Sequence, residues 1–254
     1  LTLELSADNI FGLNIASIST VTDEKELKNN NFTFTVDPQD SVDDIILITG
    51  ALSQNSRMIV GQLENIENAK IYHFFRMGIE LWNEEPLKEK YPNLKMIVLD
   101  DFPIYNEDSQ LFQKIVALGE KQQLPVIYLQ GPWANLTAGE MIRSSYTTFL
   151  PKIEDPEMLM GISPYSNLLN NSNIALDQLP PQYRAIKWIS SEKPWVSYMD
   201  ESVLIGNKNN FYLVSLPALA ENHYKISTDV QSIFTKLIHK VFLHAFHGNS
   251  GLLN

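Results

Sequence analysis

Leu94-Lys-Met-Ile-Val-Leu-Asp-Asp-Phe-Pro103 is a short, almost uninterrupted apolar run that ends in two adjacent acids and a proline. A strand with one face in water would alternate apolar and polar residues, so a continuous run predicts a strand buried on both faces. Such strands are typical of open α/β sheets, in which ligands gather beyond the carboxyl ends of the strands. Asp100 and Asp101 lie at that end, and we expect any site to be there.

The composition is that of a folded globular protein. Hydrophobic residues make up 44% of the 254 residues and charged residues 19%, which predicts a substantial core. The formal charge of −11 argues against nucleic acid as a partner, because binding a phosphate backbone needs clustered Lys and Arg. No apolar run approaches the roughly 20 residues that span a bilayer. The chain begins at Leu1 without Met, which suggests a processed fragment and leaves a preceding signal or anchor open.

Residues 1–40 are predicted to form a β-rich element separate from an α/β domain at residues 42–254. Two segments, Leu1–Leu5 and Phe32–Val36, alternate apolar with polar residues, which is typical of half-buried strands. We interpret this element as the remnant of a sandwich domain or as an added hairpin. The segment Asp37–Ser41, with Pro and Asp as turn formers, is the predicted linker.

From Val42 onward, apolar strands alternate with segments of helical length. The predicted strands are Asp44–Gly50, Ala69–Phe75, Leu94–Leu99 and Leu124–Leu129. The predicted helices run from Ser53 through Ile66, over Ile79–Tyr91 with an interruption at Pro86, and from Asn106 or Asp108 to Gly119. This order predicts a parallel sheet with right-handed crossovers and helices on both faces, a flavodoxin-like doubly wound α/β fold.

The second half of the chain predicts an antiparallel addition and a closing helix. The predicted elements are strands at Ala185–Ile189 and Trp195–Tyr198, a hairpin at Val203–Leu216, and helices at Leu136–Tyr146 and Ser227–Phe246. The hairpin should turn at Gly206–Asn210. Gly248 is expected to cap the last helix, which should pack back on the sheet. The predicted sheet is therefore mostly parallel, with a late antiparallel hairpin.

Over roughly residues 42–247, the order of these elements resembles the class I glutamine amidotransferase-like fold. In that family the turn after the fourth strand is a nucleophile elbow of the form Gly-x-Cys-x-Gly, and a His-x-Glu pair follows the late hairpin. Here Gly131 and Pro132 stand where the Cys would be, and Val214–Leu219 contains no His-x-Glu. The chain has no Cys at all. Since a nucleophile needs a thiol or hydroxyl beside a base, the resemblance implies a relative without amidase activity.

The resemblance further implies an interaction or scaffolding module. Non-catalytic relatives of this kind occur beside immunoglobulin-like β domains in bacterial cell-envelope proteins, and the β-rich residues 1–40 fit that arrangement. The expected location is periplasmic or otherwise extracytoplasmic, with the cytoplasm as the alternative. The expected partner is a protein or a small ligand, and we expect no cofactor and no metal.

Asp100 and Asp101 support two alternative functions. A hydrolase could use one of them as an acid or base, which predicts a pocket, a raised pKa and a partner base. A small-ligand receptor could use the same crevice without chemistry. Adjacent strand residues point to opposite faces, so the two acids serve one site only if the chain has already turned. The competing interpretation is that they cap the following turn or are solvated.

Ser53, Gln130, Gly131 and Trp133 complete the candidate ligand-binding set at the strand ends. Ser53 begins a helix and could serve either as its N-cap or as part of an anion site. The surrounding segment 50–56 matches neither the phosphate-binding nor the dinucleotide glycine pattern. Trp133 follows the fourth strand, where it would either bind a sugar or peptide or close the crevice.

The histidines are expected to be structural. His244 and His247 share a face of the last helix, whereas His239 does not, so a third metal ligand is missing. A favourable interaction with the carboxyl-terminal helix dipole is the preferred interpretation of all three. His73 lies in an apolar strand and His223 in a polar loop, positions that also favour structural roles.

Overall fold

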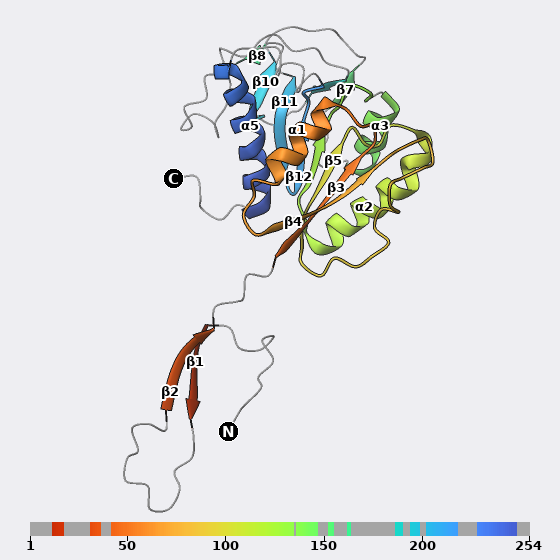
Figure 1. The fold of residues 1–254 in the computed structure, drawn as a ribbon. Helices are drawn as coiled ribbons and strands as arrows, with labels where there is room; N and C mark the ends of the chain where they lie inside the picture. The colour runs from red at the N-terminus through yellow and green to blue at the C-terminus, as the bar shows by residue number, and fades with distance from the viewer. Residues whose placement is uncertain are drawn as a thin grey trace, which may run out of the picture. The chain divides into compact units, whose positions relative to one another are not determined.

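The computed structural model describes residues 12–17, 31–36, 42–134, 136–146, 152–154, 162–163, 186–189, 194–198, 202–217 and 228–247. The chain divides into two compact units, Leu1–Val42 and Asp43–Asn254 (Figure 1). In the first unit, β1 (Gly12–Ser17) and β2 (Asn31–Val36) form an antiparallel pair. The strand predicted at Phe32–Val36 is confirmed. Sequence reasoning missed β1, and the strand predicted at Leu1–Leu5 lies outside the described residues.

The second unit is built on an eight-stranded sheet. Its strands, in spatial order, are β4 (Ala69–Phe75), β3 (Asp43–Thr49), β5 (Leu94–Asp100), β6 (Val126–Leu129), β12 (Phe211–Val214), β11 (Val203–Lys208), β10 (Val196–Tyr198) and β8 (Ile162–Ser163). The strands from β4 to β12 are parallel to one another, and the other three are antiparallel to their neighbours. The predicted parallel core and late hairpin are confirmed. A separate antiparallel pair joins β7 (Lys152–Glu154) to β9 (Lys187–Ile189).

Helices cover both faces of this sheet. On one face α1 (Gln54–Leu63) and α5 (Thr228–His247) share a core with alternate strand residues such as Ile45 and Val98. On the other face α2 (Ser109–Gln122) and α3 (Leu136–Ser145) pack on the intervening residues, such as Ile46 and Leu99. Figure 1 shows the two helix pairs on opposite sides of the strands. Because both faces are covered, β3 and β5 need continuous apolar sequences, and the doubly wound fold is confirmed.

The segment between β4 and β5 is not the helix predicted over Ile79–Tyr91. Residues 77–93 form turns and bends, and Leu87 has a φ of 60°, which no α-helix accommodates. The chain reverses direction immediately after β4, where the Met77 N–H donates to the Leu81 carbonyl at 2.7 Å. An isolated antiparallel bridge joins Arg76 to Trp82 at the base of this turn. The crossover is therefore an ordered loop without a helix.

Asn83 closes part of the outer edge of β4. Its N–H donates to the Phe75 carbonyl at 3.0 Å, and its side-chain Oδ1 accepts the Phe75 N–H at 2.7 Å. Its Nδ2 donates to the His73 carbonyl at 3.1 Å. A single residue thus satisfies three backbone groups that an edge strand would otherwise leave open.

Two predicted boundaries are wrong for local reasons. Helix α2 continues through Gly119 to Gln122, and Gln123 ends it with a φ of 55°. Gly119 serves close packing instead, because a Cβ there would lie 2.9 Å from Val126 Cγ2. The hairpin turn is shorter than the predicted Gly206–Asn210, since β11 extends to Lys208 and Asn209 takes up the left-handed conformation with a φ of 51°.

The helices predicted at Leu136–Tyr146 and Ser227–Phe246 are confirmed as α3 and α5. Gly248, the expected cap of α5, lies outside the described residues. None of the helices in the described part of the chain combines the length and the apolar character needed to cross a bilayer.

Candidate functional site

The carboxyl ends of four neighbouring parallel strands bring most of the predicted site residues together. The Gly50 N–H donates to the Asp100 carbonyl at 2.9 Å, and the Asp101 N–H donates to the Leu129 carbonyl at 2.9 Å. The Gln130 N–H donates to the Val214 carbonyl at 2.8 Å. These bonds continue the strand pairing of β3, β5, β6 and β12 into the turns that follow. Asp100, Asp101, Gln130 and Gly131 therefore share one edge of the sheet, as predicted.

The Asp100 carboxylate is fully buried between β5 and the start of α1. Its relative exposure is 0%, and its Oδ2 accepts the Thr49 hydroxyl at 3.2 Å. Burial raises the pKa of Asp100 to about 6, although hydrogen bonds from Ser56 and Thr49 oppose the shift. Its Oδ1 has no hydrogen-bond partner among the described residues. A proton on this carboxyl would therefore relieve a desolvated charge.

The Asp101 carboxylate serves the turn after β6. Asp101 has a φ of 47°, so the chain has already turned at this residue. Its Oδ2 accepts the Trp133 N–H at 2.9 Å. Burial raises the pKa of Asp101 to about 7; the charge of Asp100 adds to this shift, and the Trp133 hydrogen bond opposes it. The two acids thus face different neighbours, Asp100 towards β3 and α1 and Asp101 towards the β6 turn.

Gly131 has no room for a side chain. A Cβ at this position would lie 2.3 Å from Asp101 Cγ and 2.5 Å from Asp101 Oδ2. Gly50 also packs against this residue, since a Cβ there would lie 2.1 Å from the Asp101 carbonyl oxygen. The segment in which the amidotransferase resemblance would place a nucleophile is therefore backbone packed on an internal carboxylate.

The Gln130 side chain connects the end of β6 to the residue that follows β12 and to Trp188 in β9. It is buried, and its Oε1 accepts the Ser215 hydroxyl at 2.5 Å and the Trp188 indole N–H at 3.2 Å. Tyr128, two residues earlier, is also fully buried, and burial together with the nearby charges of Asp101 and Asp100 raises its pKa well above the usual value. Gln130 is thus held inside the protein and is not displayed to solvent.

Ser53 and Trp133 lie at the rim of this edge. The Ser53 hydroxyl accepts the Asn55 N–H at 3.1 Å, and Ser56 Oγ accepts the Ser53 N–H at 3.1 Å. This reciprocal pair is a capping box, which confirms the N-cap prediction. Trp133 is 63% exposed. Its role in binding a ligand stays a prediction.

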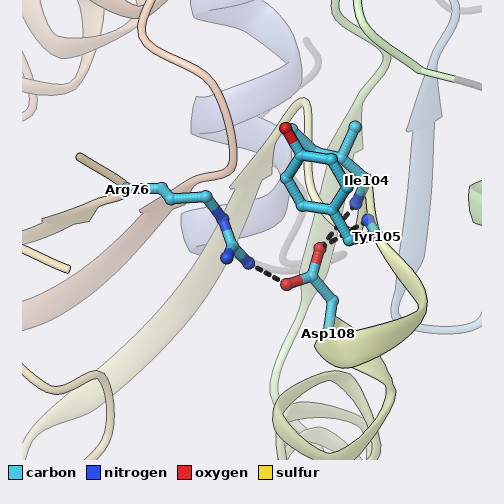
Figure 2. A network of polar contacts seen from close by, with 4 residues as sticks. All are labelled: Arg76, Ile104, Tyr105 and Asp108. Atoms are coloured by element: carbon cyan, nitrogen blue, oxygen red, sulfur yellow. Dashed lines mark hydrogen bonds and ion pairs between the residues drawn. The ribbon is translucent and has the colours of Figure 1, made fainter. Parts of the chain in front are cut away.

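Sequence reasoning missed a buried ion pair at the same edge. Arg76, which follows β4, pairs through Nη2 with Asp108 Oδ1, and the other carboxylate oxygen accepts the N–H groups of Ile104 and Tyr105 at 2.7 and 2.9 Å (Figure 2). The Arg76 guanidinium also lies 4.5 Å from the Trp82 ring centroid. Burial lowers the pKa of Arg76. Arg76 is the first residue after β4, as Asp101 is the first residue after β5. A charged residue directly after a predicted strand was the available signal.

Two of the histidines contact a hydroxyl group. His73 Nε2 lies 3.0 Å from Thr49 Oγ1, and His244 Nδ1 lies 3.0 Å from the Tyr212 hydroxyl. Burial lowers the pKa of both rings. His244 lies in the last turn of α5, and its interaction with the helix dipole stays a prediction. His223 lies outside the described residues. Within the described ranges, no group of three or more His, Cys, Asp or Glu residues is arranged to hold a metal ion.

Similarity to solved structures is distant. A glutamine amidotransferase from Thermotoga maritima aligns with a TM-score of 0.41 and 10% identity, over 79% of this chain and 90% of that one. A β-galactosidase from the psychrophilic Marinomonas ef1 aligns with a TM-score of 0.37 and 7% identity, over 75% of this chain and 29% of that one. Comparison of the sequence with protein-family models and with curated proteins gives no match. The assignment of the fold class therefore rests on the strand order and register of the chain itself.

Proposed function

We propose that the α/β unit is a non-catalytic amidotransferase-like domain that serves as an interaction or scaffolding module in the bacterial cell envelope. The observation that carries the proposal is the contact between Asp101 and the turn after β6. The carboxylate accepts the Trp133 N–H at 2.9 Å and fills the space beside Gly131. The chain itself thus occupies the place at which a reacting group would have to bind.

The electrostatics of this turn oppose acyl-transfer chemistry. Free N–H groups at a turn between a strand and a helix can hold the oxyanion of a tetrahedral intermediate. Here such a donor, the Trp133 N–H, is already bonded to an internal acid. An oxyanion would have to displace a carboxylate that is negative when ionised, and position 131 offers no nucleophile. A binding role is consistent with both features.

A hydrolase that uses the two acids is the main alternative. Raised pKa values of about 6 for Asp100 and about 7 for Asp101 are what a general acid or base would need. However, the two residues are 0% and 1% exposed, and a catalytic group must come within hydrogen-bond distance of its substrate. The same burial argues against a small-ligand receptor that contacts these acids.

The envelope location is supported by the organisation of the chain. A β unit with an antiparallel pair, β1 and β2, precedes the α/β unit, as in the envelope proteins that the resemblance implies. Fractionation of the native cells with an antibody against the chain tests this location. Recovery with the periplasm or envelope is the expected result, and recovery with the cytoplasm would refute it.

The absence of catalysis is tested with the purified chain. We expect no hydrolysis above the buffer rate for glutamine, for p-nitrophenyl esters or for peptide amides at pH 5 to 8. The matched controls are the variants Asp100→Asn and Asp101→Asn, which remove one ionisable group each and nearly preserve the side-chain shape. Turnover that is present in the unmodified chain and lost in either variant would establish the hydrolase instead.

A further inference from the structure

We propose that the hairpin at residues 76–82 is the docking surface for a cationic, apolar segment of a partner protein. This inference names the surface and the partner class for the interaction module, and it rests on that proposed function. The hairpin follows β4 at the carboxyl edge of the sheet. Its outer residues carry no role in the strand-end contacts described above.

The hairpin displays large apolar side chains to solvent. Met77 is 56% exposed, Ile79 61% and Leu81 59%, and they alternate with Gly78 and Glu80 within five consecutive residues. Single exposed apolar residues are ordinary, whereas adjacent ones indicate an interaction surface. Nothing in the covalent geometry of a tight turn requires three such side chains, because polar residues serve a turn equally well.

The hairpin is a preformed structure. The Met77 N–H donates to the Leu81 carbonyl at 2.7 Å, and the Leu81 N–H donates back to the Gly78 carbonyl at 3.3 Å. At the base, the Trp82 ring lies 4.5 Å from the Arg76 guanidinium and 5.8 Å from the Phe102 ring. A surface that is already ordered loses little conformational entropy when a partner binds.

Other exposed apolar residues lie at the same edge of the sheet. Of the seven large hydrophobic residues that are exposed in the described part of the chain, six follow the parallel strands β3 to β6, and Val42 precedes β3 at the opposite edge. The six are Leu52, Met77, Ile79, Leu81, Tyr105 and Trp133. The Tyr105 ring lies 5.3 Å from the Arg76 guanidinium, and Figure 2 shows both residues around Asp108. An exposed aromatic ring on the next loop thus lies close to Arg76 at the base of the hairpin.

The charges beside this surface are acidic. Residues 77–85 contain three Glu and no Lys or Arg, and Glu107 is exposed two residues after Tyr105. Lys88 pairs with Glu85 on the surface. Glu80 and Glu84 are the two acids closest in sequence to the apolar residues of the hairpin. Lys and Arg around an apolar centre would complement this pattern.

The acidic charge also distinguishes between the possible partners of this surface. An anionic membrane would be repelled by Glu80, Glu84 and Glu107. A second copy of the chain would bring together two molecules that each carry a formal charge of −11, which opposes association at low ionic strength. A basic protein segment meets neither obstacle, and it is the occupant that the surface favours.

Selection from a random dodecapeptide phage library on the full 254-residue chain tests the partner class. Selected peptides are expected to combine apolar residues with Lys or Arg, and fluorescence anisotropy then gives their Kd. The triple variant Met77→Ser, Ile79→Ser, Leu81→Ser is expected to weaken binding by about tenfold or more, since apolar anchors dominate such contacts. Val42→Ser removes an exposed apolar residue at the opposite edge and should leave Kd unchanged.

The charge contribution is measured separately. The double variant Glu80→Gln, Glu84→Gln is expected to weaken binding by about threefold to tenfold at low salt, and much less at about 0.5 M salt, where charges are screened. Glu120→Gln, an exposed acid in α2, is the matched control and should have a smaller effect than the double variant.

Three results would overturn the docking surface or its occupant. Peptides without Lys or Arg would refute the partner class, and unchanged binding in the triple variant would refute the surface. A dimer in sedimentation that the triple variant loses would assign the surface to a second copy of the chain. Circular dichroism checks that the variants are folded. If the triple variant is unfolded, the peptide Kd of the single variant Ile79→Ser takes its place in this test. Glutamine turnover by the unmodified chain would refute the proposed function while leaving the docking result intact.

Discussion

Gly131 and Asp101 pack so closely that a Cβ on Gly131 would lie 2.3 Å from the Asp101 carboxyl carbon. Gly131→Ala must therefore push the carboxylate away from the Trp133 N–H that it accepts. Forcing a methyl group into a well-packed site costs about 1 to 3 kcal/mol and sometimes more. We expect a loss of unfolding free energy in that range, measured by urea denaturation.

Gly61 provides the matched control for this prediction. It lies within α1, and a Cβ there would meet nothing within 4 Å. Gly61→Ala should therefore stabilise the chain by about 0.5 to 1 kcal/mol through helix propensity. Equal effects of the two substitutions would contradict the close packing at Gly131.

Asp100 makes the stability depend on pH. Its pKa rises from 3.8 to about 6 on folding, so between about pH 4 and pH 6 the folded chain holds a proton that the unfolded chain has released. The contribution of Asp100 to stability is therefore greatest at low pH, and it is lost as the pH rises through this window. Asp100→Asn mimics the protonated form and should be more stable than the unmodified chain at pH 8 by roughly 2 to 3 kcal/mol.

Urea denaturation at pH 4 and pH 8 measures this effect. At pH 4 the unmodified chain and Asp100→Asn should differ little, because Asp100 is then protonated in the folded state. Glu67→Gln, which changes an exposed acid, is the control and should show no comparable gain between the two pH values. The gain in unfolding free energy of Asp100→Asn over the unmodified chain should grow from pH 4 to pH 8. A gain that shrinks over this range would contradict the raised pKa of Asp100.

The strands of the sheet could be predicted because their sequence signal is local. An apolar run such as Leu94–Leu99 is typical of a strand that is covered on both faces by helices. The end of each run also locates the carboxyl edge of the sheet. The resulting prediction correctly brought Asp100, Asp101, Gln130 and Gly131 together.

The contacts within that edge could not be predicted in the same way. The bond from Trp133 to Asp101 depends on a positive φ at Asp101, which few residues other than Gly adopt. The helix predicted over Ile79–Tyr91 failed because tertiary contacts decided the local structure. Trp82 packs under Arg76 and against Phe102, and Arg76 in turn needs Asp108, 32 residues later in the chain. Short-range periodicity contains no information on such partners.

Replacing one partner of the buried ion pair between Arg76 and Asp108 should lower the unfolding free energy markedly. Asp108→Asn leaves the Arg76 charge buried without its counter-ion, which typically costs about 3 to 5 kcal/mol. The double variant Arg76→Met, Asp108→Asn should recover part of this loss, because no uncompensated charge remains. A double-mutant cycle in urea denaturation measures the coupling between the two residues.

The surface pair of Lys88 and Glu85 is the control for this cycle. Both side chains are mostly exposed, at 72% and 74%, and such pairs contribute about 0 to 1 kcal/mol. Glu85→Gln should therefore change the unfolding free energy little. A coupling between Arg76 and Asp108 as small as that between Lys88 and Glu85 would argue against a buried ion pair.

The capping box at the start of α1 gives a further prediction. Ser53→Ala removes the acceptor of the Asn55 N–H and should destabilise the chain by about 1 kcal/mol, whereas Ser53→Thr should retain most of the stability. Thermal unfolding of the two variants makes the comparison. Equal losses for Ala and Thr would show that the hydroxyl of Ser53 does not cap the helix.

Asn83 affects how the protein behaves at high concentration. Its main chain and side chain together imitate a neighbouring strand along the last residues of β4, and at the other end of the sheet β8 has only two residues. A second chain therefore finds little template on which to add a strand. Many copies of this domain can therefore be crowded together without joining edge to edge into fibrils.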